Sequence, residues 1–166
     1  MPAQFEKALA AFPFSRLSPN STLRVYAIGF GEAPLMEEVL EGGIAPGEIA
    51  QAASEFLNED CAFQIEAKWD LWQRDHDWKL APSRVVMELY APLFENDRGD
   101  HFRIEAGPEY LFLPEGKERN LRAIQSNIRS VLRLTQDLSS ALGATRKLLW
   151  TDSGANFAGQ LEAALL

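Results

Sequence analysis

The side chains best suited to acid–base chemistry lie at alternate positions of one segment, Cys61–Trp72. Its even positions are mainly polar, and its odd positions are apolar: Cys61, Phe63, Ile65, Ala67, Trp69 and Leu71. Glu66 and Asp70 are the candidate catalytic carboxylates, since two carboxyl groups about 5–10 Å apart can share acid and base roles. In an extended strand these two residues would lie about 13 Å apart, which is too far for such a pair. We therefore expect a solvated face of cross-strand charge pairs.

A pocket that gathers outward-facing charges from several strands is the alternative to this interpretation. Its candidate residues are Glu66, Asp70, Glu88 and Arg103, which alternation places on the wet faces of successive strands. Such a pocket, between the sheet and the helices, would belong to a small-molecule-binding protein or an enzyme. Catalytic groups with shifted pKa values need burial, which the alternation does not predict, so we favour the solvated face.

The remaining reactive side chains are isolated from one another. His76 lies in a polar turn and His101 lies on a separate segment, so their spacing does not predict a metal site. Cys61 falls on the apolar face of its strand, where a free cysteine packs as a small hydrophobic residue. The segment Gly29–Pro34 lacks the third glycine of a dinucleotide-binding turn. We predict no catalytic residue, no metal and no cofactor.

Two tryptophans flank the polar turn and form the main candidate binding patch. Trp72 and Trp78 would stabilise a hairpin as a cross-strand pair by about 0.2–1 kcal/mol. Together with Asp70, Asp75 and Asp77 they would instead form an acidic, aromatic patch of the kind found at protein–protein hot spots. Both interpretations stay open at this point.

A second candidate patch is the one positive cluster in the chain. Arg122, Arg129 and Arg133 follow one another at spacings that place them near each other on a helix. They would bind an anion or the acidic surface of a partner, or form an ordinary polar helix face.

Composition and charge restrict the class of protein. The chain has 166 residues, 46 % hydrophobic and 24 % charged, with a net charge of −8. This size suits a single domain covering residues 1–166, and the negative charge disfavours nucleic acid as a partner. One cysteine allows no intrachain disulfide. The N-terminus does not resemble a secretion signal, and no apolar run reaches the length of a membrane span, so we expect a cytoplasmic protein that does not bind membranes.

Hydrophobic periodicity predicts an α+β fold. An antiparallel meander sheet of about five strands carries helices packed mainly on one face, the longest over residues 120–142. The expected strands are Thr22–Phe30, Cys61–Trp72, Arg84–Leu93, His101–Ala106 and Tyr110–Leu113, with Lys147–Trp150 as a possible sixth. The expected helices are Gln4–Phe12, Pro46–Leu57, Asn120–Leu142 and Asn156–Leu165. Glu32–Gly47 is expected to be an irregular connection, with one helical turn at Met36–Leu40.

These observations favour a soluble, non-catalytic binding protein, such as a stoichiometric partner or inhibitor of a basic protein. The alternatives are the small-molecule pocket described above and a structural subunit of a homo-oligomer such as a homodimer, paired through an apolar edge such as Tyr110–Leu113. All three depend on the apolar row that begins at Cys61 facing the interior.

Overall fold

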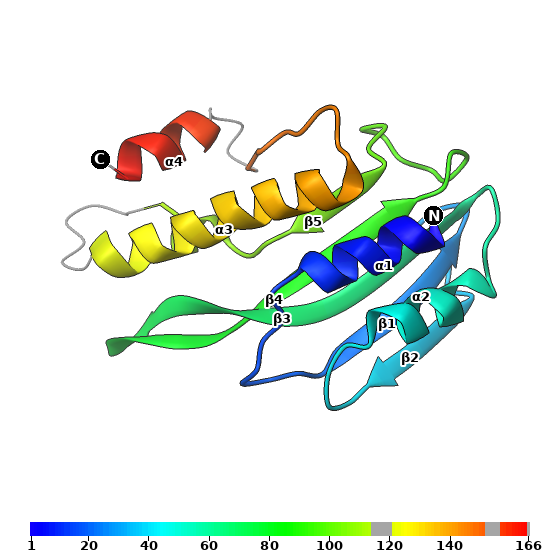
Figure 1. The fold of residues 1–166 in the computed structure, drawn as a ribbon, viewed down its shortest axis with the longest axis horizontal. Helices are drawn as coiled ribbons and strands as arrows, with labels where there is room; N and C mark the ends of the chain where they lie inside the picture. The colour runs from blue at the N-terminus through cyan, green and yellow to red at the C-terminus, as the bar shows by residue number, and fades with distance from the viewer. Residues whose placement is uncertain (114–120, 152–156, 166) are drawn as a thin grey trace.

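Five strands form one antiparallel sheet in the computed structural model, which describes residues 1–113, 121–151 and 157–165. The strand order is β2-β1-β3-β4-β5 (Figure 1). The strands are β1 (Ser21–Ala27), β2 (Met36–Leu40), β3 (Cys61–Asp75), β4 (Asp77–Tyr90) and β5 (Phe102–Glu105). The last three follow one another as a meander, whereas β1 lies between β2 and β3. The predicted α+β class with an antiparallel sheet of about five strands is confirmed.

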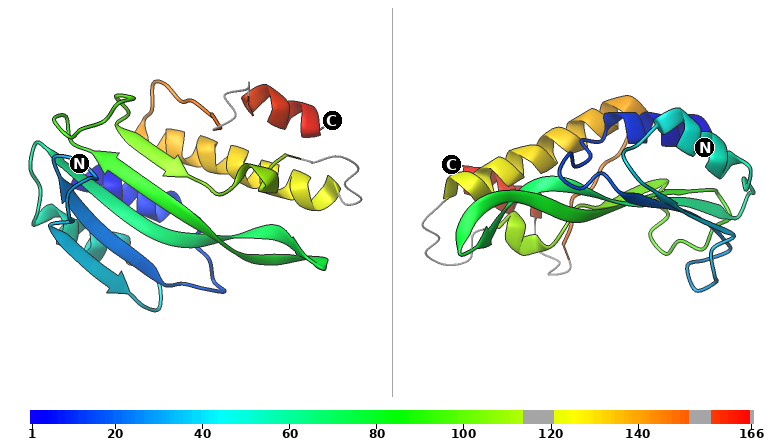
Figure 2. Two further views of the ribbon diagram at one scale, coloured as in Figure 1. Left: turned by 180° about the vertical axis from the view of Figure 1, so that it is seen from behind. Right: turned by 90° about the horizontal axis from the view of Figure 1, so that it is seen from below.

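The helices gather on one face of this sheet, as the sequence predicts. They are α1 (Pro2–Ala11), α2 (Pro46–Ser54), α3 (Leu121–Leu142) and α4 (Phe157–Leu165), with a short 3₁₀ helix, η1 (Glu109–Leu111). Figure 2 shows α1, α2 and α3 above the sheet when it is viewed along its plane. Helix α1 contacts both α2 and α3, and α4 packs against α3. The opposite face carries no α-helix within the described ranges, and we call it the open face.

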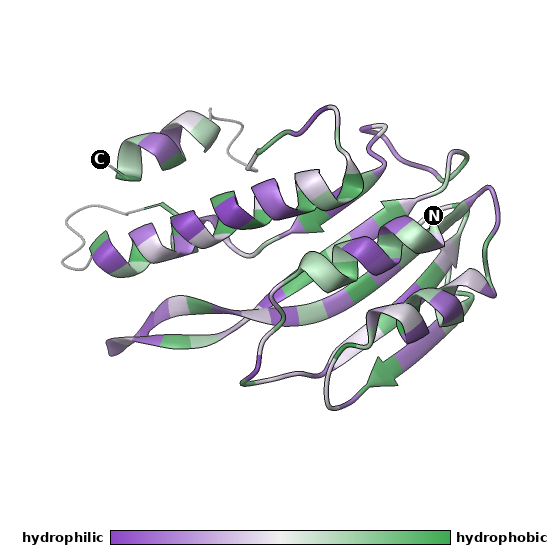
Figure 3. Cartoon of the chain, viewed as in Figure 1, coloured by the Kyte–Doolittle hydropathy of each residue, from purple (hydrophilic) through white to green (hydrophobic). Residues whose placement is uncertain are grey.

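The core lies between this helical layer and the apolar rows of the strands. Phe63, Ile65 and Trp69 of β3 are buried, whereas Lys68 between them is exposed. Figure 3 shows the resulting alternation of hydrophilic and hydrophobic bands along β3. Burying a large apolar side chain stabilises a fold by about 1.5–3 kcal/mol, so this row fixes which face of β3 points inward. The predicted inside and outside of this strand are confirmed.

The two central strands extend beyond their neighbours as a two-stranded ribbon. Strand β1 pairs with β3 only as far as Glu66, and β5 pairs with β4 only from Val86 to Leu89. The rest of β3 and β4 stays paired to its end, where His76 makes the turn with a φ of 67°. The polar connection predicted around this turn is therefore mostly strand.

Pro82 lies within β4, although proline has no N–H to donate to a strand ladder. The Ala91 N–H donates to the Cys61 carbonyl (2.9 Å), so odd positions of β4 bond to β3 and even positions face away from it. The missing N–H of Pro82 therefore faces the side where β5 has already ended, and no ladder bond is lost.

Three local predictions are wrong. Met36–Leu40 forms strand β2 rather than a helical turn, because all five residues pair with β1 while Met36 and Leu40 pack on the core. Most of Tyr110–Leu113 lies in or beside the 3₁₀ helix η1 rather than in a strand, with Leu111 and Phe112 buried. Lys147–Trp150 is not a strand. Asn120 and Asn156, the predicted first residues of two helices, lie outside the described residues.

Candidate binding surface on the open sheet face

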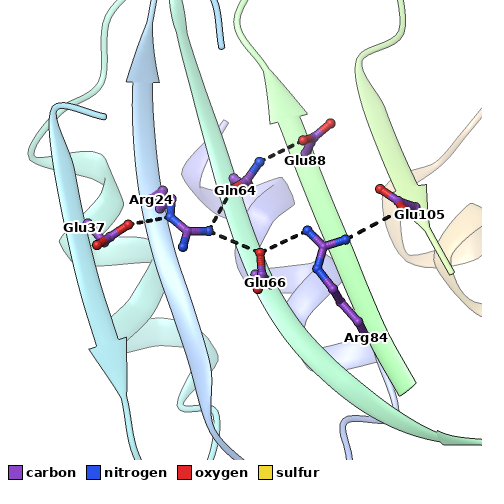
Figure 4. A network of polar contacts seen from close by, with 7 residues as sticks. All are labelled: Arg24, Glu37, Gln64, Glu66, Arg84, Glu88 and Glu105. Carbon is purple, nitrogen blue, oxygen red and sulfur yellow. Dashed lines mark hydrogen bonds and ion pairs between the residues drawn. The ribbon is translucent and has the colours of Figure 1, made fainter. Parts of the chain in front are cut away.

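A chain of hydrogen bonds and ion pairs crosses the open face (Figure 4). At one side, Arg24 of β1 donates from Nε to Glu37 Oε2 of β2 at 2.6 Å. Its Nη1 reaches β3 on the other side, at 3.3 Å from Gln64 Oε1 and 3.4 Å from Glu66 Oε2. The strand register places Arg24 directly opposite both Glu37 and Gln64, so these contacts follow from the pairing itself.

The same chain continues to the far edge of the sheet. Arg84 of β4 donates from Nη2 to Glu66 Oε2 at 3.1 Å, and its Nη1 lies 3.7 Å from Glu105 Oε1 of β5. Gln64 donates from Nε2 to Glu88 Oε1 at 2.9 Å. We call these seven residues the open-face network: Arg24, Glu37, Gln64, Glu66, Arg84, Glu88 and Glu105. The network touches all five strands, and its four glutamates outnumber its two arginines.

Glu66 is the centre of this network because it binds both arginines. The hydrogen bond from Arg84 and the charges of Arg84 and Arg24 lower the pKa of Glu66 below the ordinary value of 4.5, despite some burial. The hydrogen bond that Arg24 donates to Glu37 raises the pKa of Arg24. Glu66 therefore stays a carboxylate at neutral pH, which suits an ion pair and not a proton donor.

An aromatic cluster lies at one end of the open face. Tyr26 of β1 and Tyr90 of β4 meet Phe30 and Phe94 from the loops that follow these strands. The Phe30 ring lies 4.9 Å from those of both Tyr26 and Phe94, and Ala62 lies buried among them. Phe30 keeps 40 % of its surface exposed. We call Tyr26, Phe30, Tyr90 and Phe94 the aromatic end.

Tyr90 joins the aromatic end to the open-face network. Its hydroxyl donates to a Glu88 carboxylate oxygen, and burial, with this hydrogen bond, raises the pKa of Tyr90 well above its usual range. The Arg103 guanidinium lies 5.4 Å from the Tyr90 ring, within the range of a cation–π contact, and 2.9 Å from Asp100 Oδ2. Polar and apolar halves of the surface are therefore continuous.

The structure brings together three of the four residues of the predicted pocket. Glu66 and Glu88 belong to the open-face network, and Arg103 lies directly opposite Glu88 in the register. Asp70 lies further along β3, where it accepts a hydrogen bond from Ser15 Oγ at 2.5 Å. The three neighbours lie on an open sheet face, each already bound to other side chains, so their arrangement fits a surface better than an enclosed pocket.

The predicted tryptophan patch lies on the ribbon. The register places Trp72 opposite Leu80 and Trp78 opposite Arg74, so the two indoles are diagonal neighbours rather than a directly opposed pair. Both are half-buried, and Trp78 packs against the core. Asp75 lies 3.4 Å from Lys79. Asp75 and Asp77 are exposed near the tip, and Asp70 lies further from it. A binding role for this patch stays a prediction.

The predicted positive cluster lies on the exposed side of α3. Arg122, Arg129 and Arg133 are all exposed, and Arg133 Nε lies 3.7 Å from Asp137 Oδ2 one turn further on. Surface ion pairs of this kind contribute about 0–1 kcal/mol. The arrangement is that of a solvated helix face, and anion binding there stays a prediction.

The isolated reactive groups do not converge. Cys61 is buried, and burial raises the pKa of its thiol, which keeps the sulfur protonated. In the described part of the chain, no group of three or more His, Cys, Asp or Glu side chains is placed to hold a metal ion. Nor does any helix within those residues have the length and apolarity needed to cross a bilayer.

Sequence reasoning missed several residues of this surface. Glu37 lies in a strand where the sequence predicts an irregular connection, and the partners of Arg24 follow only from the register. The aromatic end did have a signal, since Tyr26 and Tyr90 occupy polar-face positions of their strands. Aromatic residues on two wet faces indicate a second apolar cluster outside the main core.

No family model, no curated protein and no solved structure matches this chain.

Proposed function

We propose that this protein is a non-catalytic binding protein that docks on a basic protein partner through its open face. The observation that carries the proposal is a face spanning five strands that no described α-helix covers and on which glutamates outnumber arginines. The net charge of −8 would accelerate the encounter with a positively charged partner.

The ends of the open-face network support this proposal. Glu37 and Glu105 are 51 % and 71 % exposed, and each is paired with one arginine of this chain. A carboxylate can accept several hydrogen bonds, so each can also bind a Lys or Arg side chain from a partner. The arginines already hold these side chains in place, which lowers the entropy that binding must remove.

The aromatic end supplies the apolar part of the proposed interface. Phe30 is 40 % exposed, and the preceding Ile28 is 60 % exposed. Binding hot spots are enriched in aromatic side chains inside a rim of polar residues, and the aromatic end borders the open-face network where Tyr90 binds Glu88. We infer that Phe30 is the anchor and that the network provides the polar surroundings.

The lowered pKa of Glu66 supports the proposal that the protein is not a catalyst. A general base that works at neutral pH needs a pKa raised towards 7, whereas that of Glu66 is lowered. The charged side chains of the network are already bound to one another, which suits recognition.

Affinity capture with paired charge reversals tests the proposal. The open-face variant carries Glu37→Lys and Glu105→Lys. The control carries Glu55→Lys and Glu162→Lys, which change the net charge equally at exposed sites on the helical side. The tagged proteins are used to capture partners from a lysate of the cells that make the protein, at low and high salt. We expect basic proteins captured by the wild type and by the control, with capture weakened by salt and lost in the open-face variant. If both variants capture the same proteins equally well, the open face is not the interface.

A further inference from the structure

Strand β2 ends the sheet on one side, and its backbone shows which groups face outward. The Ile28 N–H donates to the Asp60 carbonyl at 2.8 Å, in the register that pairs β1 with β3. Even positions of β1 therefore bond to β3, and odd positions bond to β2. The odd positions pair with Met36, Glu38 and Leu40. The N–H and C=O groups of Glu37 and Val39 therefore point away from the sheet.

These outward backbone groups form an edge that can accept another strand. Among the described residues, no strand pairs with this side of β2, which is the first strand of the sheet order. Val39, in the middle of this edge, is 65 % exposed. Addition of an extended peptide to such an edge is a common mode of recognition, in which main-chain hydrogen bonds provide affinity.

A groove lies beside this edge on the helical side, between β2 and α2. Its volume is about 370 Å³. Its lining includes apolar residues and three glutamates: Leu23, Leu40, Ile49, Ala52, Glu38, Glu41 and Glu48. Side chains of an added strand would alternate between this groove and the open face. The groove would therefore select every second side chain of the peptide.

The charge of the groove indicates the chemistry of the occupant. Glu38, Glu41 and Glu48 are exposed, and the lining contains no Lys or Arg. A Lys or Arg side chain of a peptide would pair with these carboxylates while its methylene groups cover Leu40 and Ile49. A second copy of this chain fits less well, because β2 paired with β2 would bring its own glutamates together.

We propose that β2 binds an extended basic segment of a partner protein as a sixth strand, with its Lys or Arg side chains in the groove beside α2. The site goes beyond the function proposed above, because it uses a strand edge and a groove on the helical side rather than the open-face network. The peptide test below changes no residue of that network, so its failure would leave the function proposed above unaffected.

Fluorescence anisotropy with a defined peptide tests the proposal. The probe is a labelled peptide of about nine residues, a usual strand length, that alternates Lys with Thr or Val. Binding to the full chain is compared with binding to Val39→Pro, which removes an outward N–H, and to the matched Val39→Thr, which keeps it. We expect Val39→Pro to weaken binding about two- to tenfold, the effect of one lost hydrogen bond, and Val39→Thr to bind like the wild type.

A second probe keeps the test valid even if Val39→Pro disturbs the fold. The same peptide with N-methyl groups on alternate residues keeps its charge but loses N–H donors along one edge. One of the two N-methylation registers should bind more weakly than the parent peptide, and amide exchange should slow at Glu37 and Val39 when the parent peptide binds. Equal binding of the parent and of both methylated peptides would show charge attraction without strand addition and overturn the proposal. A dimer that forms through β2 and excludes the peptide would overturn it as well.

Discussion

Two strand edges in this protein present backbone N–H and C=O groups of the same kind. The described residues cover the edge of β3 and leave the outer edge of β2 open. Strand β1 does not extend beyond Glu66 of β3, so the outer N–H and C=O groups of the rest of β3 need other partners. The Ser15 N–H donates to the Lys68 carbonyl at 2.8 Å. Asn127 of α3 binds both backbone groups of Trp72, each at 2.8 Å. The outer edge of β2 has no comparable cover from the described residues.

The covered edge of β3 is part of the fold, whereas the outer edge of β2 is available to a partner. Asn127 is buried and acts as a substitute for a strand neighbour, which holds the ribbon against α3. Strand β2 is instead short and carries charged side chains, including Glu37 and Glu38, which disfavour pairing between identical chains. The chain therefore limits self-association at β2 without closing the edge.

The largest predicted effect comes from removing the Asn127 side chain, which covers the edge of β3. Asn127→Ala removes the partners of the Trp72 N–H and C=O, and of the Leu111 carbonyl, which Asn127 also binds at 2.9 Å. Buried groups left without partners cost about 1–3 kcal/mol each, so we expect unfolding to require about 3 kcal/mol less free energy. Urea denaturation measures this loss, with Gln136→Ala, an exposed change on the same helix, as control. Equal midpoints for the two variants would mean that the edge does not need Asn127.

An intermediate effect tests which backbone groups of β2 face outward. Glu38→Pro removes an N–H that faces Leu23 of β1, whereas Val39→Pro removes one that faces solvent. We expect Glu38→Pro to lower the free energy of unfolding by about 2 kcal/mol, because a ladder bond is lost, and Val39→Pro to lower it by much less. Thermal and urea denaturation of the two variants give the comparison directly. The reverse order would show that our assignment of the outer edge is wrong.

The two edges also differ in how far the sequence predicts them. The apolar row of β3 was predictable because a two-residue period continues over Phe63, Ile65 and Trp69. The role of Asn127 was not predictable, because a polar residue within the apolar stripe of a helix only interrupts the pattern. Its role follows from its hydrogen bond with the Trp72 backbone. Strand β2 is too short to show a clear period, and the open-face network needs the register, which only long-range pairing determines.

The smallest predicted effect concerns Glu66, which lies at the position where the β1 partner ends and the covered edge of β3 begins. Its pKa in the folded protein is lowered, chiefly by the hydrogen bond from Arg84. A lowered pKa means that the charged form stabilises the fold above the ordinary value of 4.5, and that this stabilisation is lost as the pH falls below it. Glu66→Gln removes the titrating group, so its free energy of unfolding should be lower than that of the wild type at neutral pH.

This difference should be a few tenths of a kcal/mol, because Glu66 is partly exposed and solvent screens its ion pairs. It should shrink as the pH falls from neutrality to below the ordinary value of 4.5, because the wild-type carboxylate takes up a proton as the pH falls through its lowered pKa, and shrink also in about 1 M salt. Urea denaturation of both proteins across this pH range measures it. A difference that stays constant with pH would mean that Glu66 stabilises the end of the β1–β3 pairing through its shape and hydrogen bonds alone. The boundary between the paired and the covered parts of β3 would then not depend on charge.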